Sequence, residues 1–384
     1  MKKDLGLYLH VPFCVKKCNY CDFLSKEATE EEKEAYVDAL IKEIKSYKKF
    51  AGNYKVSTVF VGGGTPSCLR AEQTKRIFDA LYEIFEFVKH PEITTEMNPG
   101  TVDREKLEVY KACGINRLSI GMQSVKDENL KVLGRIHNFE QLLEAYQLSR
   151  EAGFTNINLD LMSSLPSQTK EKWEEELQKT VELNPEHISA YQLIIEEGTP
   201  FYEKYDAHPE LLPNEEESRA IYQTTKRILE ANGYMQYEIS NYARDGYECR
   251  HNVGYWIRRD YLGFGIGAAS LIDNVRFQNE KSLGAYLAHP LESREEEQTL
   301  TVQDRMEETM FLGLRLTRGV SCVDFAEQYG RTVEEVYGEV IARNVADGLL
   351  TVTERKENQK KDRFLALTKR GLDLSNYVMA QFLF

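Results

Sequence analysis

Residues 5–21 read LGLYLHVPFCVKKCNYC and place three cysteines directly after a short apolar run. The run Leu5–Val11 predicts a β-strand, and Cys14, Cys18 and Cys21 follow in the loop behind it. Thiolates with two or three residues between them can converge on one metal centre. Closed structural zinc sites use four ligands, whereas a cluster of four irons held by three cysteines keeps one iron open. The spacing therefore favours a 4Fe–4S cluster, with structural zinc or three inert thiols as the alternatives.

Short apolar runs alternate with helical patterns as far as residue 232. In the segments Glu30–Lys49 and Ala71–Val88, apolar residues recur every three or four positions, which predicts amphipathic helices. Strands separated by helices indicate parallel βα units with right-handed crossovers. Six such units favour an α/β fold with a partial or open barrel over a closed eight-fold one. The predicted strands are Leu5–Val11, Ser57–Val61, Ile93–Met97, Arg117–Met122, Asn156–Met162 and His187–Ile194.

The remainder of the chain has a different pattern. A loop at Asp206–Glu217 leads into a predicted helix, Glu216–Asn232. The stretch Gly233–Asn279 contains many aromatic residues and glycines and is expected to be rich in loops. After the acidic run Glu295–Glu297, three helices and a strand–turn–strand predict a small winged-helix-like α+β domain. We therefore expect three parts, at 1–232, 233–295 and 296–384. The last part comprises predicted helices Gln303–Leu314, Cys322–Tyr329 and Val333–Asp347, strands Leu349–Thr353 and Phe364–Leu367, and the turn ERKENQKKDR at 354–363.

Composition narrows the class of protein. The chain of 384 residues is 42% hydrophobic and 29% charged, which excludes a disordered chain and a small disulfide-stapled scaffold. The net charge of −13 disfavours nucleic acid as a partner. No apolar run approaches the roughly 20 residues that span a bilayer, and the N-terminus does not resemble a secretory signal. Seven cysteines, three of them clustered, do not suggest a disulfide framework. We therefore expect a cytoplasmic protein without stable membrane insertion.

Further candidate residues lie where the predicted strands end. In barrels of parallel strands, active sites form at the carboxyl ends of the strands. Gly62–Pro66, a turn with three successive glycines, ends the second strand and offers backbone N–H groups to an anionic group. Four polar residues occupy similar positions near later strands. They are Glu96, Gln123, Arg135 and Asp160.

The C-x3-C-x2-C spacing resembles that of the radical S-adenosylmethionine (SAM) superfamily, and further phrases resemble its coproporphyrinogen-oxidase-like branch. This resemblance extends over essentially the whole chain. It implies a partial (βα)6 barrel, a 4Fe–4S cluster on Cys14, Cys18 and Cys21, and SAM bound at the open iron. The phrases are Leu7–Cys14, Ser119–Gln123, Leu133–Asn138, Asp160–Pro166 and Gly198–Phe201.

The same resemblance implies a set of SAM-binding residues. The glycine-rich turn would bind the aminocarboxylate of SAM, Tyr20 would pack against the adenine, and Tyr8 would hydrogen-bond near the methionyl end. Ile194 would touch the nucleoside. The full set is Tyr8, Tyr20, Gly63, Gly64, Thr65, Glu96, Gln123, Arg135, Asp160 and Ile194.

Two functions occur in the branch, and the resemblance favours one. The oxygen-independent coproporphyrinogen III dehydrogenases carry a fourth cysteine two positions after the third, where this chain has Phe23, and they have a long segment ahead of the cluster. Residues 250–256, RHNVGYW, resemble the H-N-x-x-Y-W motif of the branch's heme chaperones.

The resemblance therefore implies a protein that binds heme as cargo and delivers it to acceptor proteins, with transient membrane association compatible with that role. Coproporphyrinogen dehydrogenase activity is the alternative, and no catalytic residue is assigned. A purely structural zinc protein is the third class. The candidate heme-binding residues are His251, Asn252, Tyr255 and Trp256.

Overall fold

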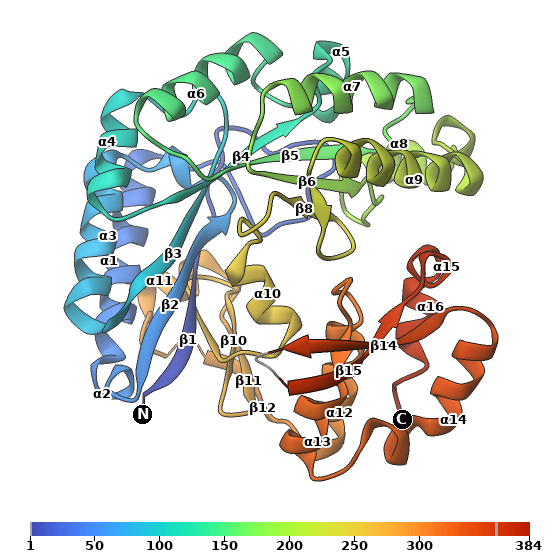
Figure 1. Ribbon diagram of the computed structural model, residues 1–384. Helices are drawn as coiled ribbons and strands as arrows, with labels where there is room; N and C mark the ends of the chain where they lie inside the picture. The colour runs from blue at the N-terminus through green and yellow to red at the C-terminus, as the bar shows by residue number, and fades with distance from the viewer. Residues whose placement is uncertain (1, 293, 358–359) are drawn as a thin grey trace.

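A computed structural model describes residues 2–292, 294–357 and 360–384, and its main feature is a row of six parallel strands (Figure 1). Neighbours in the chain are neighbours in the sheet, in the order β1 to β6. Each of the six strands predicted from the sequence corresponds to one of them, so the open (βα)6 barrel is confirmed. The strands are β1 (Lys3–Val11), β2 (Tyr54–Gly63), β3 (Phe87–Met97), β4 (Arg117–Gln123), β5 (Ile157–Ser163) and β6 (His187–Gln192).

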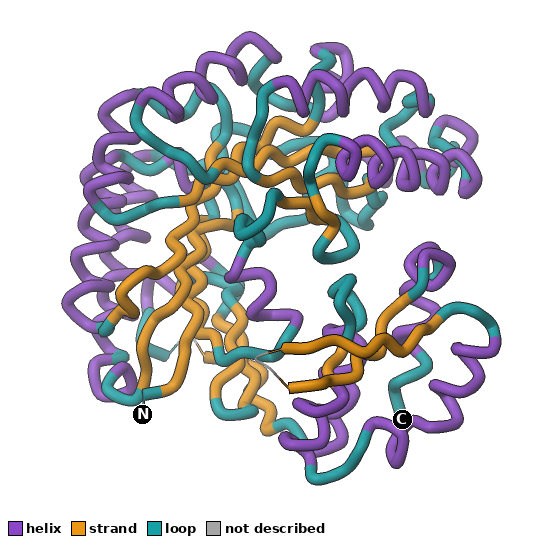
Figure 2. The backbone as a smooth tube through the Cα atoms, in the orientation of Figure 1, coloured by secondary structure: helices purple, strands orange, loops and turns teal. Residues whose placement is uncertain are grey.

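Helices cover the outer face of these strands (Figure 2). The helix predicted at Glu30–Lys49 begins where expected, because Thr29 and Glu32 form a capping box, but it ends at Ser46. The helix predicted at Ala71–Val88 is too long, since Phe85 is extended and β3 starts at Phe87. The helices of this part are α1 (Glu30–Ser46), α2 (Lys48–Ala51), α3 (Ala71–Ile84), α4 (Arg104–Ala112), α5 (Asp127–Leu133), α6 (Phe139–Glu151), α7 (Lys170–Glu182), α8 (Pro200–Tyr205) and α9 (Glu215–Ala231).

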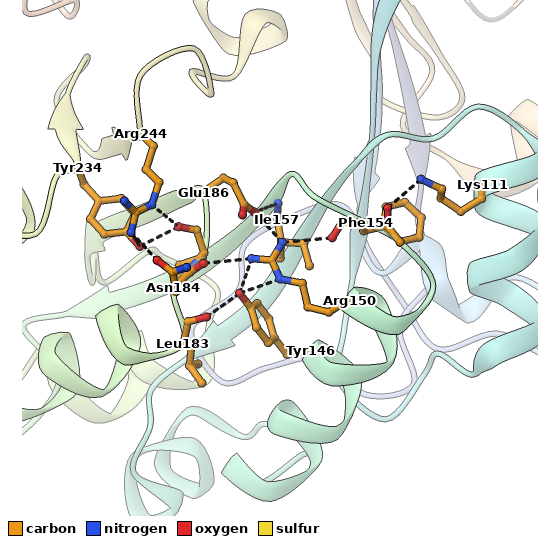
Figure 3. Close-up of polar contacts among 12 residues, drawn as sticks. Lys111, Tyr146, Arg150, Phe154, Ile157, Leu183, Asn184, Glu186, Tyr234 and Arg244 are labelled. Atoms are coloured by element: carbon orange, nitrogen blue, oxygen red, sulfur yellow. Dashed lines mark hydrogen bonds and ion pairs between the residues drawn. The ribbon is translucent and has the colours of Figure 1, made fainter.

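The amino ends of β5 and β6 are joined by a polar network around Arg150 of α6 (Figure 3). Its guanidinium contacts the Glu186 carboxylate at 2.9 Å and donates to the carbonyl oxygens of Phe154 and Asn184. Glu186 in turn accepts from the backbone N–H of Ile157 at the start of β5. These contacts tie α6, β5 and β6 together at the amino ends of the strands, the end of the barrel opposite to their carboxyl ends.

The stretch Gly233–Asn279 is rich in loops, as expected, but it also contains short strands and one helix that were not predicted. Its strands extend the sheet at both edges, with β9 parallel to β1 and β8 antiparallel to β6. These strands have only two to five residues, too few for a period of two to stand out among glycines. The elements of residues 233–299 are β7 (Met235–Gln236), β8 (Asn241–Ala243), α10 (Arg250–Trp256), β9 (Tyr261–Phe264), β10 (Ala269–Ile272), β11 (Val275–Asn279), α11 (Leu283–Ala288) and β12 (Arg294–Thr299).

The C-terminal part has its own hydrophobic core and a three-stranded sheet. Its three predicted helices are confirmed to within a residue at each end. The predicted turn at 354–363 is mostly hairpin ladder, with Glu354 paired to Arg363, and its centre at 358–359 lies outside the described residues. The elements are α12 (Val302–Gly313), β13 (Val320–Ser321), α13 (Cys322–Tyr329), α14 (Val333–Ala346), β14 (Leu350–Glu357), β15 (Lys360–Leu367), α15 (Lys369–Asp373) and α16 (Ser375–Ala380).

One buried acid joins this part to the barrel. Glu308 of α12 lies 2.7 Å from Arg258, which follows α10, and 2.7 Å from Arg276 of β11. The side chains of Glu308 and Arg258 are 6% and 3% exposed. A buried charge pair of this kind depends on both partners, because either charge alone would be left unpaired in the interior. Within the described residues, no helix is both long and apolar enough to cross a bilayer.

Candidate functional site

A cavity of about 420 Å³ opens at the carboxyl ends of the parallel strands, where the sequence placed the candidate residues. All three cysteines of the loop after β1 line it. Nine of the ten residues expected to bind SAM line it as well, and Tyr8 is the exception. Those nine are Tyr20, Gly63, Gly64, Thr65, Glu96, Gln123, Arg135, Asp160 and Ile194.

The glycine-rich turn after β2 lies directly against the start of the cysteine loop. The backbone N–H of Gly64 donates to Val11 at 2.8 Å, and that of Thr65 donates to Phe13 at 2.7 Å. The Thr65 hydroxyl donates to the Cys14 sulfur at 3.4 Å. A Cβ on Gly64 would lie 2.7 Å from the carbonyl oxygen of Phe13, closer than real side chains allow. Glycine is therefore required here because two backbone segments meet.

Arg135 reaches from the loop after α5 to the cysteines. Its Nη1 donates to the Cys18 sulfur at 3.6 Å, and its Nη2 donates to Gly121 and to the Asn98 side chain, each at 2.7 Å. Its buried Nε has no partner among the described residues. Hydrogen bonds to a sulfur stabilise the thiolate that binds metal, and the unpaired Nε leaves a donor for an anionic ligand.

Two carboxyl groups form the floor of the cavity. Burial raises the pKa of Glu96 to about 8, with the nearby Asp160 adding to the shift, although the Gly63 N–H donates to Glu96 at 3.2 Å. Burial also raises the pKa of Asp160, which accepts hydrogen bonds from Ser119 and from Asn158. A floor of this kind is suited to a cationic amino group, because such a group would neutralise carboxylates that are costly to keep ionised.

Gln123 is held in a strained conformation at the end of β4. Its φ of 65° is in the left-handed region, and the register with β5 shifts between Ile120 and Gln123. The hydroxyl of Tyr191 in β6 donates to the Gln123 Oε1 at 2.7 Å and fixes the amide. Tyr191 and Asn98 also line the cavity, although neither was predicted. Their positions at the ends of β6 and β3 are the signal that could have found them.

The two tyrosines expected near SAM occupy different places. Tyr20 lines the cavity, and its ring centroid lies 6.4 Å from that of Phe201. Tyr8 lies behind the wall, where its hydroxyl is 3.0 Å from His10 Nδ1. The Nε2 of His10 is 2.8 Å from the Leu24 carbonyl oxygen, and burial lowers the pKa of this histidine. Tyr8 thus contacts His10, and His10 is in turn hydrogen-bonded to Leu24, just beyond the cysteine loop.

The H-N-x-x-Y-W motif forms α10, which packs against β2 (Figure 1). The Glu92 carboxylate of β3 accepts from the backbone N–H groups of Arg250 and His251 and so caps the helix. The His251 ring is buried, with Nδ1 2.9 Å from the Thr58 hydroxyl and Nε2 2.9 Å from the Tyr255 hydroxyl. Burial lowers the pKa of His251 to about 3. Both ring nitrogens are engaged, so iron ligation would require this helix to rearrange.

The other two candidates of the motif are partly exposed. Asn252 is half-buried, and Trp256 lies under the guanidinium of Arg315 at 4.3 Å, with its indole N–H unpaired among the described residues. Trp256 therefore faces the C-terminal part, where it lines a small cavity next to β13 and α13. The motif thus contributes to the joint between the two parts.

Comparison with known proteins agrees with this architecture. Residues 8–180 match the family model of the radical SAM superfamily, and residues 300–374 match that of the HemN C-terminal domain. The heme chaperone HemW of Lactococcus lactis is 34% identical over 100% of this chain and 98% of its own length. The chain belongs to the HemW family of radical SAM proteins. Its relatives in this family include the HemW of Bacillus subtilis, 36% identical with 98% of each chain covered, and that of Escherichia coli, 36% identical with 90% of this chain and 92% of that one covered.

A solved structure is also similar to this member of the HemW family. Coproporphyrinogen III oxidase (HemN) from Escherichia coli, described as a radical SAM enzyme, has a TM-score of 0.84 and 27% identity. The similarity covers 99% of this chain and 90% of that one. Both the barrel and the C-terminal part therefore have counterparts in a known radical SAM protein.

The residues of the cavity fit the cofactors that membership of this superfamily implies. Cys14, Cys18 and Cys21 line one cavity, and two of their sulfurs already accept hydrogen bonds. The orphan Nε of Arg135 and the floor carboxyls offer partners of both signs for an aminocarboxylate. Within the described residues, no three His, Cys, Asp or Glu side chains lie close enough together to hold a single metal ion.

Proposed function

We propose that this protein is a heme chaperone of the radical SAM superfamily, which binds heme and delivers it to acceptor proteins. The observation that carries the proposal is the full-length similarity to proteins named heme chaperone HemW, at 34% to 36% identity with at least 90% of this chain covered. We further propose that it acts in the cytoplasm, and that it is divided into three domains, residues 1–232, 233–295 and 296–384.

The cavity is proposed to hold a 4Fe–4S cluster on Cys14, Cys18 and Cys21 together with SAM. When bound, these groups supply one-electron reduction of the sulfonium of SAM. The contribution of the chain is to position them. Thr65 and Arg135 direct hydrogen bonds to Cys14 and Cys18, respectively.

The floor of the cavity is proposed to bind the amino end of SAM. Burial raises the pKa of both Glu96 and Asp160, and the charge of Asp160 adds to the shift at Glu96, so Glu96 keeps its proton at neutral pH. A cationic amino group replaces that proton as the neutralising charge, so SAM binding and proton release at Glu96 are coupled. Gln123, held by Tyr191, presents its amide to the same cavity.

The second candidate function is that of coproporphyrinogen III dehydrogenase, which the similarity to HemN favours. Against it stands Phe23, at the position where the resemblance implies a fourth cysteine. Phe23 is 63% exposed and lines the mouth of the cavity, so the residue that distinguishes the two candidate functions lies at the site itself.

One experiment separates the two. The protein is reconstituted anaerobically with iron and sulfide, mixed with ferric heme and desalted, and a parallel sample with SAM and a reductant receives coproporphyrinogen III. A Soret band that survives desalting, passes to an acceptor apoprotein and is accompanied by no conversion of coproporphyrinogen III supports the chaperone. Conversion without retained heme supports the dehydrogenase and contradicts the proposal.

A further inference from the structure

Two large apolar side chains are exposed at the mouth of the cavity. Phe23, at the end of the cysteine loop, is 63% exposed, and Ile194, just after β6, is 66% exposed. Both line the cavity opening. The cysteine loop also meets the segment beyond β6, because the backbone N–H of Phe201 donates to the Asn19 carbonyl oxygen at 2.9 Å. Exposed apolar side chains at the entrance of a cavity are typical of a surface that covers part of a ligand.

The same entrance carries two lysines of the cysteine loop. Lys16 and Lys17 are exposed and line the opening. The Lys17 ammonium donates to the backbone carbonyl oxygen of Phe23 at 3.1 Å, which ties it to the same residue that carries the exposed ring. Lys16 makes no hydrogen bond or ion pair with the part of the chain that the structure describes. Two acids also line the opening, Asp22 in the cysteine loop and Glu196 beyond β6, while both lysines belong to the cysteine loop.

We propose that this mouth, formed by Phe23, Ile194, Lys16 and Lys17, is the docking site of the heme cargo. The proposal deepens the proposed function and rests on it. A porphyrin is a flat apolar ring with two carboxylates on one edge, so the exposed aromatic ring provides a stacking surface. The lysines on the same side are placed to neutralise the carboxylates. An uncharged apolar partner would gain nothing from these lysines.

Docking at the mouth also agrees with the need to release the cargo. The ring nitrogens of His251 are buried and engaged by Thr58 and Tyr255, so heme held there would require α10 to rearrange. The mouth is open to solvent, and heme held by ring contacts and propionates can leave without any such change. Docking of this kind uses the macrocycle rather than the iron.

The test is a set of heme titrations on reconstituted protein. The variants Phe23→Ser and Lys16→Glu are compared with matched controls far from the cavity, Tyr377→Ser, a 62% exposed aromatic residue of α16, and Lys89→Glu, an exposed lysine of β3. Soret absorbance follows heme, and fluorescence follows protoporphyrin IX that lacks iron. Iron content and SAM binding are measured on every sample to show that the cavity is intact.

We expect Phe23→Ser and Lys16→Glu each to weaken heme binding about tenfold, with both controls within about twofold of the wild type. Iron-free protoporphyrin IX should bind the wild type within about threefold of heme. Heme affinity unchanged in both mouth variants would overturn the docking site while leaving the chaperone function intact. Failure of iron-free porphyrin to bind would also overturn it, since the anchor would then be the iron. A wild type that binds no heme would instead refute the proposed function.

Discussion

The Nδ1 of His251 lies 2.9 Å from the hydroxyl of Thr58, so the histidine of the H-N-x-x-Y-W motif is built into the barrel. Its Nε2 is equally close to Tyr255, and the ring packs beside Phe60. We therefore predict that His251→Ala destabilises the protein by about 2–3 kcal/mol through lost hydrogen bonds and a cavity. Chemical denaturation measures the change.

The control for this prediction is His208→Ala, because His208 is exposed and should change stability by no more than about 0.5 kcal/mol. Heme titration of the folded His251→Ala protein should show a smaller loss of affinity than Phe23→Ser. If the two histidine variants are equally stable and only His251→Ala loses its Soret band, His251 is a heme ligand and not a structural residue.

The raised pKa of Glu96 predicts that SAM binding depends on pH. The pKa rises from an ordinary value of 4.5 to about 8, so the carboxyl is largely protonated at pH 7 without a ligand. SAM affinity should therefore increase between about pH 6 and 7.5, the range in which an α-amino group stays cationic. In Glu96→Gln the affinity should fall about tenfold at pH 7.5, and most of the pH dependence between pH 6 and 7.5 should disappear. Isothermal titration in buffers of different ionisation enthalpy should detect proton release by the wild type.

The raised pKa of Glu96 also predicts that the folded protein loses stability as the pH rises, although its affinity for SAM increases. The folded protein binds this proton more tightly than the unfolded chain, so the stability it contributes is complete below pH 4.5 and is lost as the pH rises through about 8. At pH 9, SAM-free Glu96→Gln should thus be more stable than the wild type by about 1–2 kcal/mol, allowing for the solvent in the cavity. A variant less stable than the wild type at pH 9 would show that Glu96 is not costly to ionise.

Gly64→Ala should disturb the cysteine loop. The new Cβ would lie 2.7 Å and 2.9 Å from the backbone oxygen and nitrogen of Phe13. We expect a loss of about 1–3 kcal/mol in stability and iron incorporation at less than about half of the wild-type level. Gly52→Ala is the control, because its Cβ would make only an ordinary contact at 3.7 Å. Equal iron content in the two variants would mean that the turn and the cysteine loop are not coupled.

Glu308→Ala should loosen the joint between the barrel and the C-terminal part. It leaves the guanidinium of Arg258 buried without its partner, which typically costs about 3–5 kcal/mol. The double variant Arg258→Met with Glu308→Met should recover most of that loss, because the fully buried pair is gone and the remaining Arg276 is 39% exposed and stays solvated. Thermal unfolding measures both. A loss below about 1 kcal/mol for Glu308→Ala would show that Arg258 finds another partner.

The sequence predicted the barrel well because each of its strands is a separate apolar run bounded by a helical pattern. It also predicted most of the cavity, since Glu96, Gln123 and Asp160 follow from one rule about strand ends. The edge strands β7 to β12 were missed because they are short and owe their conformation to pairing with β1, β6 and one another. The surroundings of His251 depend on contacts with Glu92 and Thr58, which are distant in sequence, and no local pattern reveals them.

The central claim is that the cavity cysteines hold a 4Fe–4S cluster to which SAM binds. Its most direct test compares the wild type with a Cys14→Ala, Cys18→Ala, Cys21→Ala triple variant after anaerobic reconstitution. Cys322→Ala, in the C-terminal part, is the control. We predict iron and sulfide for one cluster per chain in the wild type and in the control. The electron paramagnetic resonance signal of the reduced cluster should change when SAM is added. The triple variant should contain almost no iron or sulfide. Stoichiometric zinc without iron, or full iron content in the triple variant, would contradict the account.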